Sequence, residues 1–223
     1  MQQRKSRKVL IYFFLFISLG SINNIQLQNF KFNQIKKIKI SGLDNTNNQY
    51  ILKQIKKLNL DNIFFTNINE IKNVFEENSI IENYTIFKIY PSTLDIKIKK
   101  TNFFAQTRNK GKVYFIGSNG KLLENKILNE KLPFIFGNPD IDEFLNFKKI
   151  IDESKISYSE IKNIFFFPSK RWDLELKSNI IIKLSNNNIR ESLKLVAEFL
   201  QSDELKDIKI IDARIKNQII LNG

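Results

Sequence analysis

The chain has 223 residues, 42% of them hydrophobic, which is enough for a membrane segment and one or two small packed domains. It contains no Cys and no His. Their absence excludes disulfides, thiolate nucleophiles, zinc sites built on Cys or His, and every Ser-His or Cys-His relay. A catalytic function would therefore depend on Asp, Glu, Lys, Ser or Tyr alone, and we expect no cofactor and no metal.

A formal net charge of +13 is compatible with binding to nucleic acid or to an anionic membrane. The Lys residues are scattered, however, and often alternate with Ile, as in residues 37–40 and 96–99. Such alternation is typical of the solvated face of a half-buried strand. No zinc-finger, RNP or Gly-rich phosphate-loop motif accompanies the charge, so we expect no nucleic-acid partner.

The N-terminal segment begins with a basic tail, residues 1–8, followed by an apolar run. A basic flank favours a cytoplasmic N-terminus. We expect a membrane segment over residues 9–27 and a polar linker over residues 28–34. The anchoring side chains would be Val9, Leu10, Phe13, Phe14, Leu15, Phe16, Ile17 and Leu19.

The apolar run is short for a membrane span, which leaves two interpretations open. A helix from Val9 to Ile22 spans about 21 Å, against a hydrocarbon core of about 30 Å. One interpretation is an uncleaved signal-anchor. The other is a cleaved signal peptide, for which Ser18-Leu19-Gly20 offers small residues at a suitable spacing. A buried core helix is disfavoured by the cations directly before the run. Under both open interpretations the rest of the chain is exported.

Residues 35–104 are predicted to form a β-α-α-β-β module. A first strand around Ile38 and Ile40 ends at Gly42. Two amphipathic helices follow, with apolar side chains at helical spacing: Ile51, Ile55 and Leu58, then Ile68, Ile71 and Phe75. Asn45-Thr46-Asn47 offers caps for the first helix, and Asn67 with Glu70 resembles a capping box for the second. Residues 84–90 and 94–98 are expected to form two strands joined at Pro91-Ser92.

Residues 105–223 are predicted to form a mainly antiparallel β domain with helices, so the fold class is α+β. Helices are expected over residues 140–154 and around residues 189–200. Alternation and turn residues predict strands at 113–116, 121–123, 161–167, 173–177, 180–184, 208–212 and 218–221. Residues 132–136 form an apolar run that ends at Gly137.

Short motifs in a consistent order carry a family resemblance. They are Ile38 to Gly42, Ile63-Phe64-Phe65, Ile89 to Ile96, Phe104-Ala105, Tyr114 to Lys121, Arg171 to Leu176, Ile180 to Leu184, and Asp212-Ala213-Arg214. Together they resemble the FtsQ/DivIB family of bacterial cell division proteins, with a POTRA module at 35–104 and an FtsQ-type β domain at 105–223. The usual acid of the turn in 114–121 is absent, and Ala213 replaces the usual Leu.

The resemblance implies a non-catalytic, single-pass inner-membrane protein of the divisome with a periplasmic body at the septum. The POTRA module would dock other division proteins. The last β strand would be an open edge that receives a strand from FtsB within an FtsB-FtsL-like pair. Main-chain hydrogen bonds supply affinity in this mode, and alternate side chains supply specificity.

The resemblance also implies a set of residues at the partner strand: Arg171, Arg214, Ile215, Lys216, Asn217, Gln218, Ile219, Ile220 and Leu221. Lys216 to Gly223 would form the edge itself. Ile215 replaces an aromatic side chain of the family, and no late Trp follows it. Simpler roles stay open: Arg214 pairing with Asp212 at the surface, Trp172 in the core, and Ile219 and Leu221 as inward-facing strand residues.

Two other functions fit parts of the sequence less well. A POTRA-containing envelope assembly or secretion factor would need a large membrane domain after Ala105, for which the remaining residues are too few. A glycan hydrolase would need two carboxylates about 5–10 Å apart across a cleft. The candidates Asp140, Asp142 and Glu143, or Glu76 and Glu77, are neighbours in one run. We therefore expect no enzyme.

Overall fold

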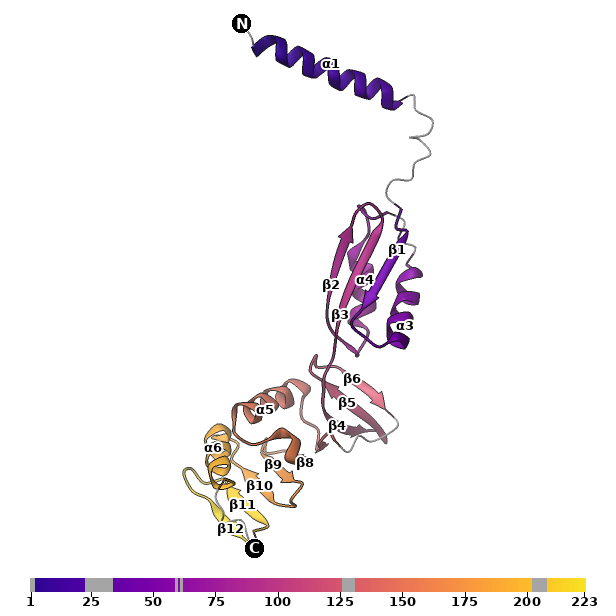
Figure 1. Cartoon of the computed structure of the whole chain (residues 1–223). Helices are drawn as coiled ribbons and strands as arrows, with labels where there is room; N and C mark the ends of the chain where they lie inside the picture. Colours follow the sequence, from indigo (N-terminus) through magenta and orange to yellow (C-terminus); the bar gives the residue numbers. More distant parts are fainter. Residues whose placement is uncertain (1–2, 23–33, 59, 61, 126–130, 202–207) are drawn as a thin grey trace. The chain divides into compact units, whose positions relative to one another are not determined.

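The computed structural model describes residues 3–22, 34–58, 60, 62–125, 131–201 and 208–223. The chain divides into two compact units (Figure 1). The first unit comprises Met1–Val74 and Thr85–Lys97, and the second comprises Phe75–Tyr84 and Ile98–Gly223.

The N-terminal segment forms one helix, α1 (Gln3–Ile22). Its apolar side chains are exposed all along the helix, from Val9 at 66% to Phe16 at 78% and Leu19 at 68%. Among the described residues, no helix combines the length and the hydropathy that a membrane crossing requires. The end of the predicted membrane segment, residues 23–27, and most of the predicted linker, up to residue 33, lie outside the described residues.

The β-α-α-β-β order of the first module is confirmed. Its elements are β1 (Lys37–Ser41), α3 (Asn45–Lys56), α4 (Ile68–Glu76), β2 (Ile81–Ile89) and β3 (Thr93–Lys100). The strands are ordered β1-β3-β2, with β1 and β3 parallel. The cap of α3 lies one residue before the predicted stretch, because the Asp44 carboxylate accepts a 3.0 Å hydrogen bond from the Asn47 amide.

The spacing of the apolar residues along α3 and β3 explains which side chains form the core of this module. Ile51 and Ile55 are buried on α3, and Leu94 and Ile96 are buried on β3, each at most 1% exposed. The intervening residues of β3 are charged and lie on the other face of the strand. Each fully buried side chain of this size contributes about 1.5–3 kcal/mol of hydrophobic stabilisation.

The second part of the chain contains a nine-stranded mixed sheet in the order β12-β11-β10-β9-β8-β7-β4-β5-β6. The strands are β4 (Phe103–Asn109), β5 (Lys112–Gly117), β6 (Leu122–Asn125), β7 (Phe134–Phe136), β8 (Ile161–Phe166), β9 (Trp172–Leu176), β10 (Ile181–Leu184), β11 (Ile210–Ala213) and β12 (Ile220–Asn222). Two α-helices, α5 (Ile141–Glu153) and α6 (Ile189–Phe199), and a short 3-10 turn (Tyr158–Glu160) accompany them.

The expectation of a mainly antiparallel domain needs qualification, because three of the eight strand pairs are parallel. These are β4 with β7, β7 with β8, and β10 with β11. The sequence also did not predict β4 as a strand. A register shift between Phe103 and Ala105 interrupts its alternation, which removes the pattern from which strands are recognised.

The core of this sheet lies on the face covered by α5 and α6 (Figure 1). Trp172 is 2% exposed and belongs to this core. Its ring stacks on Phe147 of α5 at a centroid distance of 4.4 Å and packs against Phe166 at 4.5 Å. The simpler interpretation of Trp172, a core residue, is therefore the one that the structure supports.

Two glycines with left-handed backbone provide a matched test of this packing. Gly111 has φ +81° in the β4–β5 turn, and Gly137 has φ +97° after β7. A Cβ at Gly111 would meet nothing within 4 Å, whereas a Cβ at Gly137 would overlap the main-chain carbonyl of Phe166 on β8. Gly111→Ala should lower the free energy of unfolding by about 1–2 kcal/mol. Gly137→Ala should lower it by clearly more in chemical denaturation, and equal losses would contradict this account of the β7–β8 contact.

Candidate partner-binding edge

The last strand, β12, ends the nine-stranded sheet and pairs with β11 alone among the described strands (Figure 1). The pair is antiparallel, with Asp212 opposite Ile220 and Ile210 opposite Asn222. The strand is shorter than predicted. Lys216 and Asn217 form a turn, with Asn217 at φ 58°, so the expectation that Lys216 to Gly223 form the edge is wrong for these residues. The Gln218 amide closes the turn by donating to the Ile215 carbonyl at 3.3 Å.

In β12, the main-chain N–H and C=O groups of one residue point away from the sheet. The Lys209 amide donates to the Asn222 carbonyl at 3.0 Å, so the Asn222 carbonyl faces the β11 side. Successive residues of a strand direct their N–H and C=O groups to opposite sides. The N–H and C=O groups of Leu221 therefore face outward, where an added strand would lie.

The side chains of this strand are divided between the two faces of the sheet. Leu221 lies opposite Ile211, which is fully buried on the helix-covered face, but Leu221 itself is 44% exposed. Ile219 packs against the core, as the simpler interpretation expects. Ile220 is 53% exposed and lies opposite Asp212 on the other face. The edge thus combines an unpaired main chain with two exposed aliphatic side chains.

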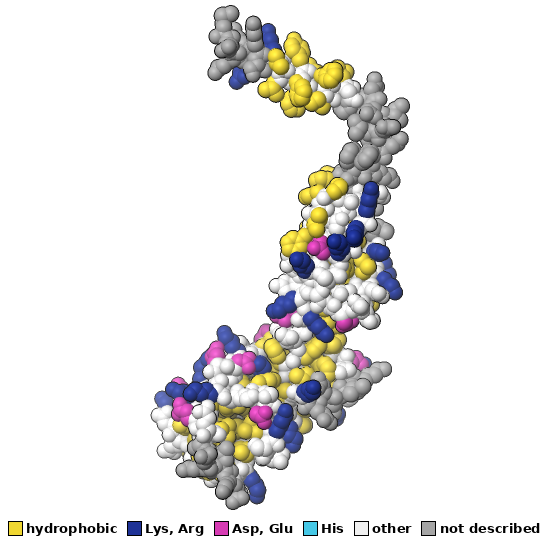
Figure 2. Space-filling view, in the orientation of Figure 1, with side chains coloured by type: hydrophobic (Ala, Val, Ile, Leu, Met, Phe, Trp, Pro, Cys, Tyr) yellow, Lys and Arg dark blue, Asp and Glu magenta, His cyan; other side chains and the backbone are white. Residues whose placement is uncertain are grey.

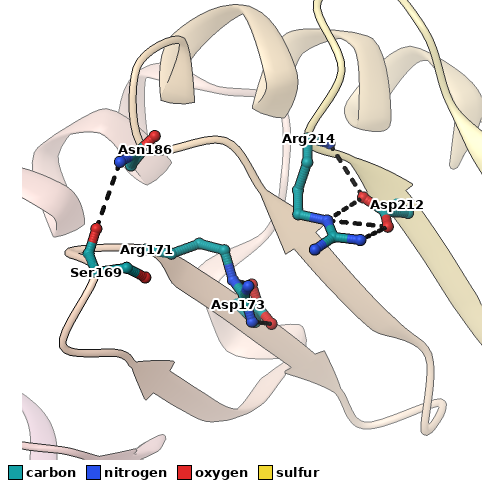
Figure 3. Close-up of polar contacts among 6 residues, drawn as sticks. All are labelled: Ser169, Arg171, Asp173, Asn186, Asp212 and Arg214. Atoms are coloured by element: carbon teal, nitrogen blue, oxygen red, sulfur yellow. Dashed lines mark hydrogen bonds and ion pairs between the residues drawn. The ribbon is translucent and has the colours of Figure 1, made fainter.

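A row of charges crosses the sheet next to this edge. The strand register aligns Asp173, Lys183 and Asp212 across β9, β10 and β11 on the face opposite α5 and α6. Arg171 pairs with Asp173 at 3.1 Å, and Arg214 pairs with Asp212 at 2.5 Å (Figure 3). The structure therefore places both arginines of the sequence-based set on one face.

The two arginines differ in how firmly they are held. The Arg171 guanidinium also lies over the Phe167 ring at 4.1 Å, and its side chain is 27% exposed. Asn186 donates to the Ser169 carbonyl at 3.4 Å and ties down the preceding turn (Figure 3). The Arg214 side chain is 47% exposed and contacts Asp212 through its Nε and Nη2 atoms.

The acidic partners have opposite pKa shifts. Burial raises the pKa of Asp173 above its ordinary value, although the bond and charge of Arg171 oppose that rise. The hydrogen bonds from Arg214 hold the pKa of Asp212 below its ordinary value. The Asp173 side chain is 6% exposed and the Asp212 side chain 16%. Because Asp173 is the more buried acid, its charged form needs its arginine partner more than the charged form of Asp212 does.

Ile215 lies at a groove that the sequence analysis did not anticipate. It is 52% exposed, and with Lys216 and Asn217 it lines a cavity of about 390 Å³. The other wall is α6, through Asn188, Glu191, Ser192, Lys194, Leu195 and Glu198. The buried Ser192 hydroxyl donates to the Ala213 carbonyl at 2.8 Å and fixes α6 to β11. Because α6 lies about 20 residues before the last strand in the sequence, no local sequence pattern predicts that α6 and residues 215–217 line one groove.

The acids considered for catalysis lie mostly at the start of α5. Asp140 is its N-cap, and Asp142 and Glu143 are in its first turn, where negative charge stabilises a helix. All three line one cavity of about 880 Å³, and Glu143 pairs with Lys170 at 3.8 Å. A role in stabilising the start of α5 accounts for all three acids without a catalytic function. Within the described part of the chain, no group of three acids could hold a metal ion.

The fold therefore defines an α+β protein with a β-α-α-β-β module followed by a mixed sheet whose last strand is an open edge. Two family models match it: the POTRA domain, FtsQ-type, over residues 33–100, and the Cell division protein FtsQ/DivIB, C-terminal, over residues 105–214. The chain belongs to the FtsQ/DivIB family of cell division proteins. Membership in this family agrees with the expectation that the chain is not an enzyme.

Relatives with curated names support the assignment. The Cell division protein FtsQ of Bradyrhizobium diazoefficiens is 23% identical over 163 residues, covering 71% of this chain and 48% of that protein. FtsQ of Rickettsia bellii is 25% identical, covering 83% of this chain and 70% of that protein. The Cell division protein DivIB of Clostridium tetani is 26% identical, covering 80% and 68%. The chain thus spans about half the length of the first of these relatives.

The two ion pairs predict different costs of truncation. Arg214→Ala should lower the free energy of unfolding at neutral pH by less than about 1 kcal/mol, as for other surface pairs. Arg171→Ala should cost about 1–3 kcal/mol, because it leaves the buried Asp173 without its hydrogen-bonded guanidinium. Denaturation of both variants beside the unchanged chain checks this order, and a larger loss for Arg214→Ala would contradict it.

The pH dependence of the Arg214→Ala effect follows from Asp212. The folded pKa of Asp212 lies below its ordinary value of 3.8. The pair therefore contributes stability above that ordinary value and loses it as the pH falls through the lower folded pKa. The two stability curves should converge only in that acidic range, and convergence near pH 6 would contradict the assignment to Asp212.

Proposed function

We propose that the chain is a non-catalytic, single-pass inner-membrane scaffold of the cell-division machinery, with residues 1–8 in the cytoplasm and its body in the periplasm at the septum. Residues 35–104 form the POTRA module, which docks other division proteins. Residues 105–223 form the β domain, whose last strand receives a strand from an FtsB-like protein within an FtsB-FtsL-like pair. Membership in the FtsQ/DivIB family supports a role in cell division.

The observation that carries the strand-binding proposal is the edge position of β12. Its outward Leu221 main chain and its exposed Ile220 and Leu221 side chains form a surface suited to β-augmentation. Exposed apolar edge strands tend to associate, so natural proteins usually shorten, charge or cover them. A partner strand would satisfy the outward main-chain groups and cover both aliphatic side chains.

The neighbouring charges suit the same partner. Arg214 follows β11, the neighbour of β12, and Arg171 lies on the same face farther from the edge, before β9. The more exposed Arg214 is available to an acidic side chain of the incoming segment. Ile215 lies at the groove against α6, where an aliphatic or aromatic side chain of the partner would fit. These side chains would supply specificity, while the main chain of β12 supplies much of the affinity.

The composition of α1 supports the anchoring proposal. Its side chains from Val9 to Ile17, together with Leu19, are apolar and exposed around the helix. Water does not stabilise a helix with such a surface. Arg7 and Lys8 precede this apolar surface, consistent with a cytoplasmic start. We propose that the segment over residues 9–27 tethers the body to the membrane.

Single changes at Leu221 test strand addition most sharply. Leu221→Pro removes the outward N–H, whereas Leu221→Ala keeps it and removes only the side chain. Binding of the purified FtsB-FtsL-like pair should weaken about two- to tenfold more for Leu221→Pro than for Leu221→Ala, the worth of one main-chain hydrogen bond. Surface-based binding measurements on the full chain would report both values.

Deletion of residues 216–223 tests the whole strand β12 in the same binding measurement. It removes β12 together with its turn, so binding of the pair should fall to the background level. Circular dichroism of the truncated chain should retain the native spectrum, because only the edge strand has been removed. Undiminished binding by the truncated chain would rule out strand addition at this edge.

A further inference from the structure

One end of the first module carries a cluster of exposed apolar side chains, which we call the aromatic tip: Phe64, Phe65, Ile89 and Tyr90. Their exposed fractions are 51%, 85%, 47% and 56%. The Phe64 and Tyr90 rings stack at a centroid distance of 4.8 Å. Figure 2 shows hydrophobic side chains gathered on this module, with Lys and Arg side chains beside them. Large aromatic rings are costly to leave in water, so the tip indicates a binding surface.

The aromatic tip is held in place by hydrogen bonds of its own loop. The Phe64 amide donates to Asn62 Oδ1 at 2.8 Å, and the Thr66 hydroxyl donates to the Asn62 carbonyl at 2.5 Å. The Lys88 ammonium donates to the Phe64 carbonyl at 3.4 Å from β2. The rings are therefore presented on a formed loop, which reduces the entropy lost when they bind.

The chain enters the module at this same end. Gln34 forms an antiparallel bridge with Asn62, next to the aromatic loop. The Lys36 and Lys37 amides donate to the Ser92 carbonyl in the β2–β3 turn at 2.9 and 3.2 Å. The side chains of Lys36 and Lys37 are exposed. The aromatic tip thus lies where the chain arrives from α1, with two exposed cations beside it.

We propose that the aromatic tip rests in the interface of an anionic bilayer, with Lys36 and Lys37 against the lipid headgroups. This inference rests on the proposed anchoring through α1. Residues 23–33 can extend to at most about 40 Å, so an anchored chain keeps the tip close to the membrane surface. Tyr and other aromatic rings, with Lys on their polar side, are the side chains that favour the headgroup region.

The proximity of the membrane favours a bilayer over a protein as the occupant of the tip. A protein partner would have to compete with a surface that the short connection holds at high local concentration. Exposed lysines next to the rings complement anionic headgroups, and each contributes about fivefold in affinity near such a surface. The tip would then hold the module at the membrane and leave the β12 edge to the partner strand.

Site-specific fluorescence on the full chain tests this contact, because the absence of Cys allows single labels. Phe65→Cys places a polarity-sensitive dye at the tip. Thr46→Cys places the dye at an exposed position in the first turn of α3. This helix follows the C-terminal end of β1, whereas the tip lies near the N-terminal end of β1. Both proteins are reconstituted in phosphatidylglycerol-phosphatidylcholine vesicles with headgroup-attached nitroxide quenchers.

The label at position 65 should shift to the blue and be quenched, and the label at position 46 should not. Lys36→Gln with Lys37→Gln should reduce the quenching at position 65 in these vesicles, by about fivefold per lysine in the docked-to-undocked ratio. Flotation of the vesicles tests the anchor separately. A chain that floats with an unquenched label at 65 overturns the tip proposal alone.

Two further outcomes would contradict the contact between the aromatic tip and the bilayer. A label at position 65 that shifts to the blue without quenching by the lipid nitroxide would show that protein, such as a second copy, covers the tip instead. A chain that fails to float with the vesicles would overturn the anchoring proposal and the tip proposal together.

Discussion

The main-chain hydrogen bonding of β12 is the constraint on which the rest of this account depends. Each inner strand of the sheet has a neighbour on both sides to pair with its N–H and C=O groups, but the edge strand β12 has a neighbour on one side only. The opposite edge of the same sheet, β6, is protected differently, since its exposed Glu124 pairs with Lys112 of β5. Charge of this kind discourages strand addition, whereas β12 presents Ile220 and Leu221.

The neighbouring elements hold β12 in a defined place. The buried Ser192 bond fixes α6 to the end of β11, and β11 in turn pairs with β12. The charge row across β9, β10 and β11 ends at Asp212, directly opposite Ile220. An incoming strand would therefore meet a preformed edge with a fixed register, so binding would not have to order the receiving strand.

Alternation and turn residues predicted most strands, and the errors have physical causes. β4 was missed because its bulge at Phe103/Ala105 breaks the period of two. β7 has three residues, too few to indicate that it pairs in parallel on both sides. The last strand was placed too early because Asn217 adopts a left-handed turn conformation that local hydropathy does not reveal. Motifs located Arg171 and Arg214, but only the strand register brings them to one face.

Amide hydrogen exchange at Leu221 tests the central claim, an open edge that a partner strand closes, most directly. In the free chain the outward Leu221 amide should exchange rapidly, while the amide of Ile220, which faces β11, should exchange more slowly. Addition of the FtsB-FtsL-like pair should slow Leu221 selectively. A Leu221 amide that is already protected in the free chain, or that exchanges at the same rate in the complex, would contradict the account.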